Sequence, residues 1–169
     1  MPSIQADKVS LQYESFGNPA DPPIVLVMGL GMQLIMWPKW LCEMLAAKGF
    51  YVVRFDNRDV GLSSHLDHLG SPNIVLATLR YLLHLPLKAA YLIDDMARDT
   101  AALLDALRIP RAHVVGASMG GMIAQNLAAN APAKVASLTS IMSTTGKRSL
   151  PQPTSKARRA LLRVPAKPG

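Results

Sequence analysis

The residues best suited to chemistry are Gly116-Ala117-Ser118-Met119-Gly120, which form a G-x-S-x-G motif. The apolar run 113–117 predicts a buried strand, and residues 119–130, followed by Pro132, predict a helix. A serine between a strand and a helix in this motif is a typical nucleophile for acyl transfer. The turn holds its hydroxyl above the sheet, and the helix N-terminus favours the negative charge that develops during the reaction.

The glycines around Ser118 have a steric explanation. In so tight a turn, side chains two residues before and two residues after the serine would collide, so Gly116 and Gly120 are required. Gly121 adds a small residue where the helix approaches the sheet. The alternative interpretation is a tight strand-to-helix turn with an inert serine.

A second glycine-containing turn follows the apolar run 23–29, which Gly29 and Gly31 end. In enzymes with a G-x-S-x-G motif, one N–H of the oxyanion hole comes from such a loop and the other from the residue after the nucleophile. The predicted donors are therefore the backbone N–H groups of Leu30 and Met119. A plain turn without a catalytic role is the alternative.

Strand and helix patterns alternate along the chain, which predicts an α/β fold with a mainly parallel sheet and helices on both faces. An edge hairpin is expected at residues 2–6 and 8–15. Further strands and helices are expected at the following positions: strands at 23–29, 51–56, 113–117 and 135–142, and helices at about 38–47, 91–108, 119–130 and 155–163.

Four segments together resemble the α/β-hydrolase superfamily: GNPADPPIVLVMGLGMQLIMWP, FDNRDVGLSS, YLIDDMARDTAALLDALRI and AHVVGASMGGMIAQ. They are similar to the esterase branch that includes the aclacinomycin methylesterase type, over about residues 8–146. The resemblance implies an eight-stranded sheet, a cap inserted after the sixth strand, and a Ser–Asp–His triad in that order. We therefore expect an N-terminal part only. Residues 1–146 would hold the first six strands and residues 147–169 the start of an incomplete cap, with the last two strands and most of the cap missing.

The chain departs from this pattern in its catalytic partners. Residues 119–169 contain no Asp, Glu or His, and all four histidines precede Ser118. His113 begins the strand that leads to Ser118, roughly 16 Å away along extended chain, and is expected to be structural. His65 and His68 are expected to be surface residues.

Two further residues and one replacement concern the loops beside the site. Asp56 and Asp59 lie in the segment FDNRDVG, which resembles a structural loop that supports the site in this family. Neither is assigned as the triad acid. Met28 stands where the family usually has histidine before Gly29, which leaves open what anchors that loop.

Charge and composition argue against several other functions. Residues 1–118 carry a net charge of −1 and residues 119–169 a net charge of +8, with no aromatic residue among the basic ones of the tail. Nucleic acid is therefore not an expected partner. No metal-ligand spacing or phosphate-binding loop occurs, so no metal or cofactor is expected. The single cysteine fits a reducing compartment, and with neither a signal peptide nor a transmembrane segment predicted, a cytoplasmic location is expected.

Two functions remain open. In the first, the protein is a serine esterase that acts on a small-molecule ester, and its catalytic Asp and His lie in a C-terminal part carried as a second piece or chain. In the second, the chain is a truncated, non-catalytic fragment or interaction module that needs a partner, because strand 135–142 would otherwise expose an apolar sheet edge. Residues 74–90 are predicted to be an amphipathic surface segment. It would pack against the missing cap, or its apolar residues would meet a lipid-like substrate or a membrane surface.

Overall fold

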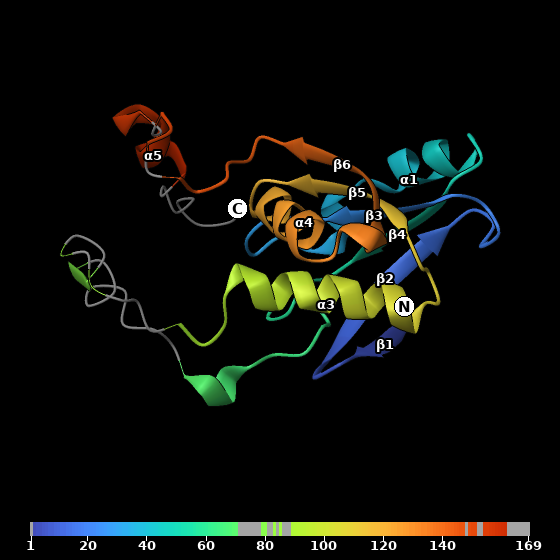
Figure 1. The fold of residues 1–169 in the computed structure, drawn as a ribbon, viewed down its shortest axis with the longest axis horizontal. Coiled ribbons are helices and arrows are strands. Elements are labelled where there is room, and N and C mark those ends of the chain that lie inside the picture. Colours follow the sequence, from blue (N-terminus) through green and yellow to red (C-terminus); the bar gives the residue numbers. More distant parts are fainter. Residues whose placement is uncertain are drawn as a thin grey trace, which may run out of the picture.

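A computed structural model describes residues 2–70, 79–80, 83, 85, 89–147, 149–151 and 154–161. Within them, one sheet has the strand order β1-β2-β4-β3-β5-β6 (Figure 1). β1 and β2 form an antiparallel hairpin, β2 pairs antiparallel with β4, and the remaining neighbours are parallel. The predicted hairpin and the four later strands are thus confirmed. Their bounds are β1 (Ser3–Ala6), β2 (Val9–Phe16), β3 (Pro23–Val27), β4 (Tyr51–Phe55), β5 (Ala112–Ala117) and β6 (Val135–Ile141).

The predicted helices are also found. They are α1 (Lys39–Ala46), α3 (Ile93–Ala106), α4 (Met119–Asn130) and α5 (Ser155–Leu161), with short 3-10 turns η1 (Leu34–Met36), η2 (Asp67–Leu69) and η3 (Pro132–Lys134). No helix in the described ranges is long and apolar enough to cross a membrane. Most of the predicted amphipathic segment 74–90 lies outside the described residues.

Helices cover both faces of the sheet, as the apolar runs of the strands predict. Successive side chains of a strand point to opposite faces, so β3 contributes to two separate cores. Val25 and Val27 pack in the core beneath α3 and α4, which lie side by side in Figure 1. Ile24 and Leu26 pack in the second core, on the side of α1. Each such apolar side chain, fully buried, contributes about 1.5–3 kcal/mol to folding.

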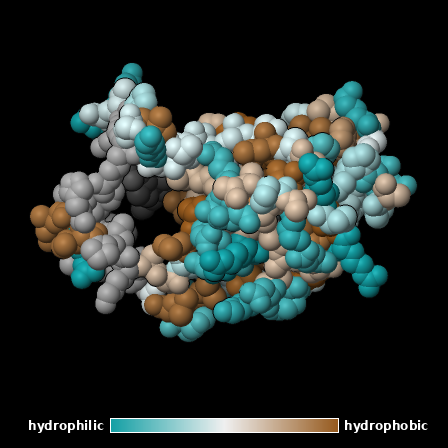
Figure 2. Space-filling view, viewed as in Figure 1, coloured by the Kyte–Doolittle hydropathy of each residue, from teal (hydrophilic) through white to brown (hydrophobic). Residues whose placement is uncertain are grey.

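The sheet has an open edge at β6, the last strand in the order. Among the described residues, β6 pairs with β5 alone, and Leu138 and Ile141 are each 40% exposed. Figure 2 shows hydrophobic side chains among hydrophilic ones along the rim where Figure 1 places β6. The strand therefore has the exposed edge that the sequence predicts.

Candidate active site

Ser118 joins β5 to α4 in a conformation that few residues adopt. Its backbone angles are φ 55° and ψ −122°, a combination that in tight turns is adopted mostly by glycine. The Ser118 N–H donates to the Ile141 carbonyl oxygen at 2.9 Å, which ties the turn to the end of β6. The residue is exposed, and no hydrogen bond of its hydroxyl to another described residue is found. The turn therefore presents a free hydroxyl at the carboxyl end of the sheet.

Space around the turn explains the neighbouring glycines. A Cβ atom on Gly116 would lie 2.2 Å from the Gly120 carbonyl oxygen, and one on Gly120 would lie 2.2 Å from the Val27 carbonyl oxygen. A Cβ on Gly121 would lie 2.5 Å from the Cβ of Ser143, in the segment after β6. The first two contacts are with backbone, which cannot move aside cheaply. Glycine at both positions thus allows α4 to start directly against β3 and β5.

The turn after β3 packs directly against Ser118. A Cβ on Gly29 would lie 3.1 Å from the Ser118 Cβ and 3.5 Å from its Oγ. The Met32 N–H donates to the Gly29 carbonyl oxygen at 3.3 Å, whereas no acceptor for the Leu30 N–H is found among the described residues. The Met119 N–H is the first of α4 and has no partner within the helix. Two N–H groups with no acceptor among the described residues therefore flank Ser118, one on the turn after β3 and one at the start of α4.

The loop after β4 holds the Gly29 turn at both ends. The Asn57 side-chain amide donates to the Met28 carbonyl oxygen at 2.9 Å. The Asp56 carboxylate accepts the Leu34 N–H at 2.6 Å and the Leu62 N–H at 3.2 Å. The expectation that Asp56 belongs to a supporting loop is consistent with these bonds. Asn57 was missed, although it follows a parallel strand at the same edge of the sheet as Ser118.

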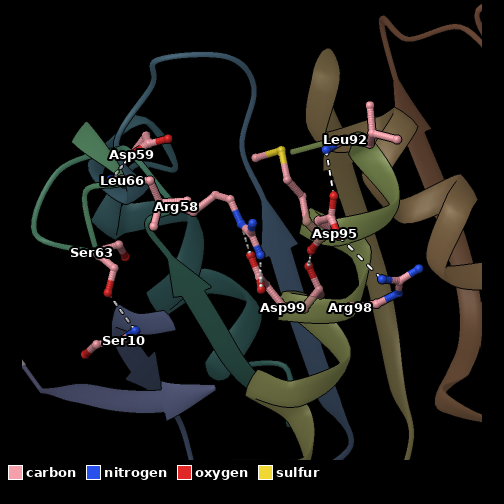
Figure 3. A network of polar contacts seen from close by, with 12 residues as sticks. Ser10, Arg58, Asp59, Ser63, Leu66, Leu92, Asp95, Arg98 and Asp99 are labelled. Carbon is pink, nitrogen blue, oxygen red and sulfur yellow. Dashed lines mark hydrogen bonds and ion pairs between the residues drawn. The ribbon is translucent and has the colours of Figure 1, made fainter. Parts of the chain in front are cut away.

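A largely buried ion pair ties the loop after β4 to α3 (Figure 3). Nε and Nη2 of Arg58 each donate to one carboxylate oxygen of Asp99 at 2.6 Å, and the guanidinium lies 5.1 Å from the centre of the Tyr91 ring. The hydrogen bond with Asp99 raises the pKa of Arg58. Burial raises the pKa of Asp99, and the hydrogen bonds from Arg58 oppose that rise. Burial, together with a hydrogen bond to Asp59, raises the pKa of Tyr91 to about 12.

The structure brings none of the described histidines into hydrogen-bonding contact with Ser118. His113 pairs with Ile24 at the start of β3, and its ring contacts Phe50 and the Ser137 hydroxyl. The Nε2 atom of His65 lies 3.1 Å from the Gly61 carbonyl oxygen, and His68 is exposed in η2. His84 lies outside the described residues.

Other reactive side chains do not offer a competing site. Cys42 lies on the face of α1 that packs into the second core and is fully buried. Burial raises the pKa of its thiol, so it remains protonated at neutral pH. Among the described residues, no group of three or more His, Cys, Asp or Glu side chains could hold a metal ion. Ser118 is therefore the candidate nucleophile that the geometry favours.

The fold agrees with comparisons to known proteins. A family model described as the alpha/beta hydrolase fold matches residues 22–167, and the chain belongs to this family. Over 136 residues the chain is 38% identical to rhodomycin D methylesterase DauP of Streptomyces sp. (strain C5) and 37% identical to rhodomycin D methylesterase DnrP of Streptomyces peucetius. Each match covers 80% of this chain but 40% of the relative.

A solved structure shows the same arrangement of strands and helices. The crystal structure of a membrane phospholipase A, described as a bacterial virulence factor, superimposes with a TM-score of 0.67 at 27% identity. The match covers 85% of this chain and 39% of that protein. The chain thus spans about 40% of the length of each of these relatives.

Proposed function

We propose that this chain carries the nucleophile and the oxyanion hole of a serine hydrolase that cleaves a carboxylic ester. The catalytic Asp and His would come from a C-terminal part that this chain does not contain. The observation that carries the proposal is the backbone of Ser118, because a cost of about 1–3 kcal/mol for such a conformation is typical of functional sites. The relatives named as methylesterases support an ester as the substrate class.

The proposed reaction proceeds in two steps. The Ser118 Oγ attacks the ester carbonyl carbon while the histidine base takes its proton, and the N–H groups of Met119 and Leu30 stabilise the negative oxygen. Collapse of the intermediate breaks the bond to the alkoxy oxygen, which receives the proton from histidine, and leaves an acyl group on Ser118. Water then releases the acid by the same route, which regenerates the hydroxyl and leaves the catalyst unchanged.

The test is hydrolysis of a methyl ester by the protein at the full length at which its source produces it. Ser118→Ala should remove the activity, because it deletes the hydroxyl on which the proposed acyl intermediate forms. Ser15→Ala, an exposed position on β2, serves as the matched control and should retain full activity. Full activity in Ser118→Ala would refute the assignment.

The open edge of β6 favours a second candidate function, an interaction module that needs a partner chain. An edge strand with one open side and partly exposed apolar side chains pairs readily with another chain. The 169-residue chain should then associate as its concentration rises in sedimentation, and Leu138→Lys should weaken that association. A stable monomer at all concentrations would count against this candidate.

A further inference from the structure

We infer that Asn57 and Asp56 are positioning residues that orient the Leu30 N–H by holding the turn after β3 on both sides of it. The inference rests on the proposed function, since it concerns how the oxyanion hole is held. Both side chains are almost fully buried, at 2% and 3% exposure, so their polar atoms depend on protein partners.

Hydrogen bonds fix the orientation of two consecutive peptide groups in the turn after β3. Asn57 donates to the Met28 carbonyl oxygen and so fixes the Met28–Gly29 peptide, which immediately precedes the one that bears the Leu30 N–H. The Met32 N–H occupies the Gly29 carbonyl oxygen inside the turn. In a trans peptide, C=O and N–H point in opposite directions, so the Leu30 N–H must point out of the turn.

Asp56 holds the far end of the turn. The Leu34 N–H starts η1 and donates to the Asp56 carboxylate at 2.6 Å. Asp56 is itself held, because its N–H donates to the Gln12 carbonyl oxygen and its own carbonyl oxygen accepts the Ser63 hydroxyl. Two consecutive residues of one loop therefore clamp the turn before and after the Leu30 N–H.

Tight packing and backbone hydrogen bonds surround the Asp56 carboxylate. A Cβ on Gly61 would lie 2.1 Å from Oδ2 of Asp56, so the loop closes tightly over the carboxylate. Among the described residues no Lys or Arg forms an ion pair with Asp56, and its two oxygens are satisfied by backbone N–H groups instead. The carboxylate thus serves to fix backbone, which is what a precisely placed oxyanion donor requires.

The experiment combines amide hydrogen exchange with kinetics. In the 169-residue chain, Asn57→Ala should accelerate exchange of the Met32 and Leu34 amides by about tenfold or more, while the β3 amide of Val25 stays protected. Asp56→Asn is the second variant and keeps the shape of the side chain. Its NH2 group must face either the Leu34 N–H or the Leu62 N–H, so one of the two hydrogen bonds is lost. Ile109→Val, which removes a methyl group from the core beneath α3, is the control for general destabilisation.

Kinetics are measured on the protein at its full length. Asn57→Ala should lower kcat roughly 10- to 100-fold and leave KM within about threefold, because a misplaced donor weakens transition-state stabilisation more than substrate binding. Ile109→Val should leave kcat unchanged. Unchanged exchange in the turn, or an equal loss of kcat in Ile109→Val, would overturn the inference. An active Ser118→Ala would instead refute the proposed function, while the exchange result would still decide whether the clamp holds the turn.

Discussion

Replacing Ser118 by glycine should stabilise the folded chain relative to replacing it by alanine. Both substitutions remove the hydroxyl, and they differ in whether position 118 keeps a Cβ atom. Alanine keeps the cost of φ 55° and ψ −122°, about 1–3 kcal/mol for a residue with a Cβ, and glycine removes it. Glycine also loses about 0.5–1 kcal/mol more conformational entropy on folding. The net expectation is that Ser118→Gly is about 0.5–2 kcal/mol more stable than Ser118→Ala.

The assay is thermal unfolding of both variants, followed by circular dichroism. For a chain of this size, the expected difference corresponds to a Tm about 1–8 °C higher for the glycine variant. The same pair of substitutions at Ser15, in the extended strand β2, provides a control in which the order should reverse, because glycine there has only its entropic cost. Equal stability of the two Ser118 variants, or a less stable glycine variant, would refute backbone strain at Ser118.

Two further predictions concern the cluster that ties the loop after β4 to α3. Arg58→Met or Asp99→Ala alone should each cost about 3–5 kcal/mol in urea unfolding, because the remaining charge is left buried without its partner. The double variant should cost less than the sum, with a coupling of about 1–3 kcal/mol, and additive losses would show that the pair is not coupled. Tyr91 should make stability fall between pH 10 and about 12, since the folded state keeps a proton there that the unfolded state releases. The free energy of unfolding of the native chain should therefore fall relative to that of Tyr91→Phe as the pH rises over that range. A difference that stays constant with pH would contradict the raised pKa.

Much of the fold could be predicted because it depends on local patterns. Buried strands appear as continuous apolar runs, and α4 spans the predicted residues 119–130. The spacing of glycines around Ser118 predicts the tight turn, since a Cβ atom on Gly116 or Gly120 would lie 2.2 Å from a backbone oxygen. The roles of Ser118, Leu30 and Met119 in catalysis stay predictions that the experiments above address.

The anchoring of the turn after β3 could not be predicted in the same way. Asn57 and Met28 are 29 residues apart, and their hydrogen bond exists because β4 lies beside β3 in the sheet. Nothing in the sequence between them specifies that neighbour relationship or the direction of the amide. The pairing of Arg58 with Asp99, 41 residues later, has the same origin.

The sequence by itself determined the elements, the mainly parallel sheet and the candidate nucleophile, because these follow from hydrophobic periodicity and from the steric demands of single residues. Only the tertiary structure decided which polar groups hold the candidate oxyanion turn. Hydrogen bonds need atoms within about 3 Å of one another, and residues distant in sequence reach that separation only when the strand order and the packing of α3 and α4 have fixed their positions.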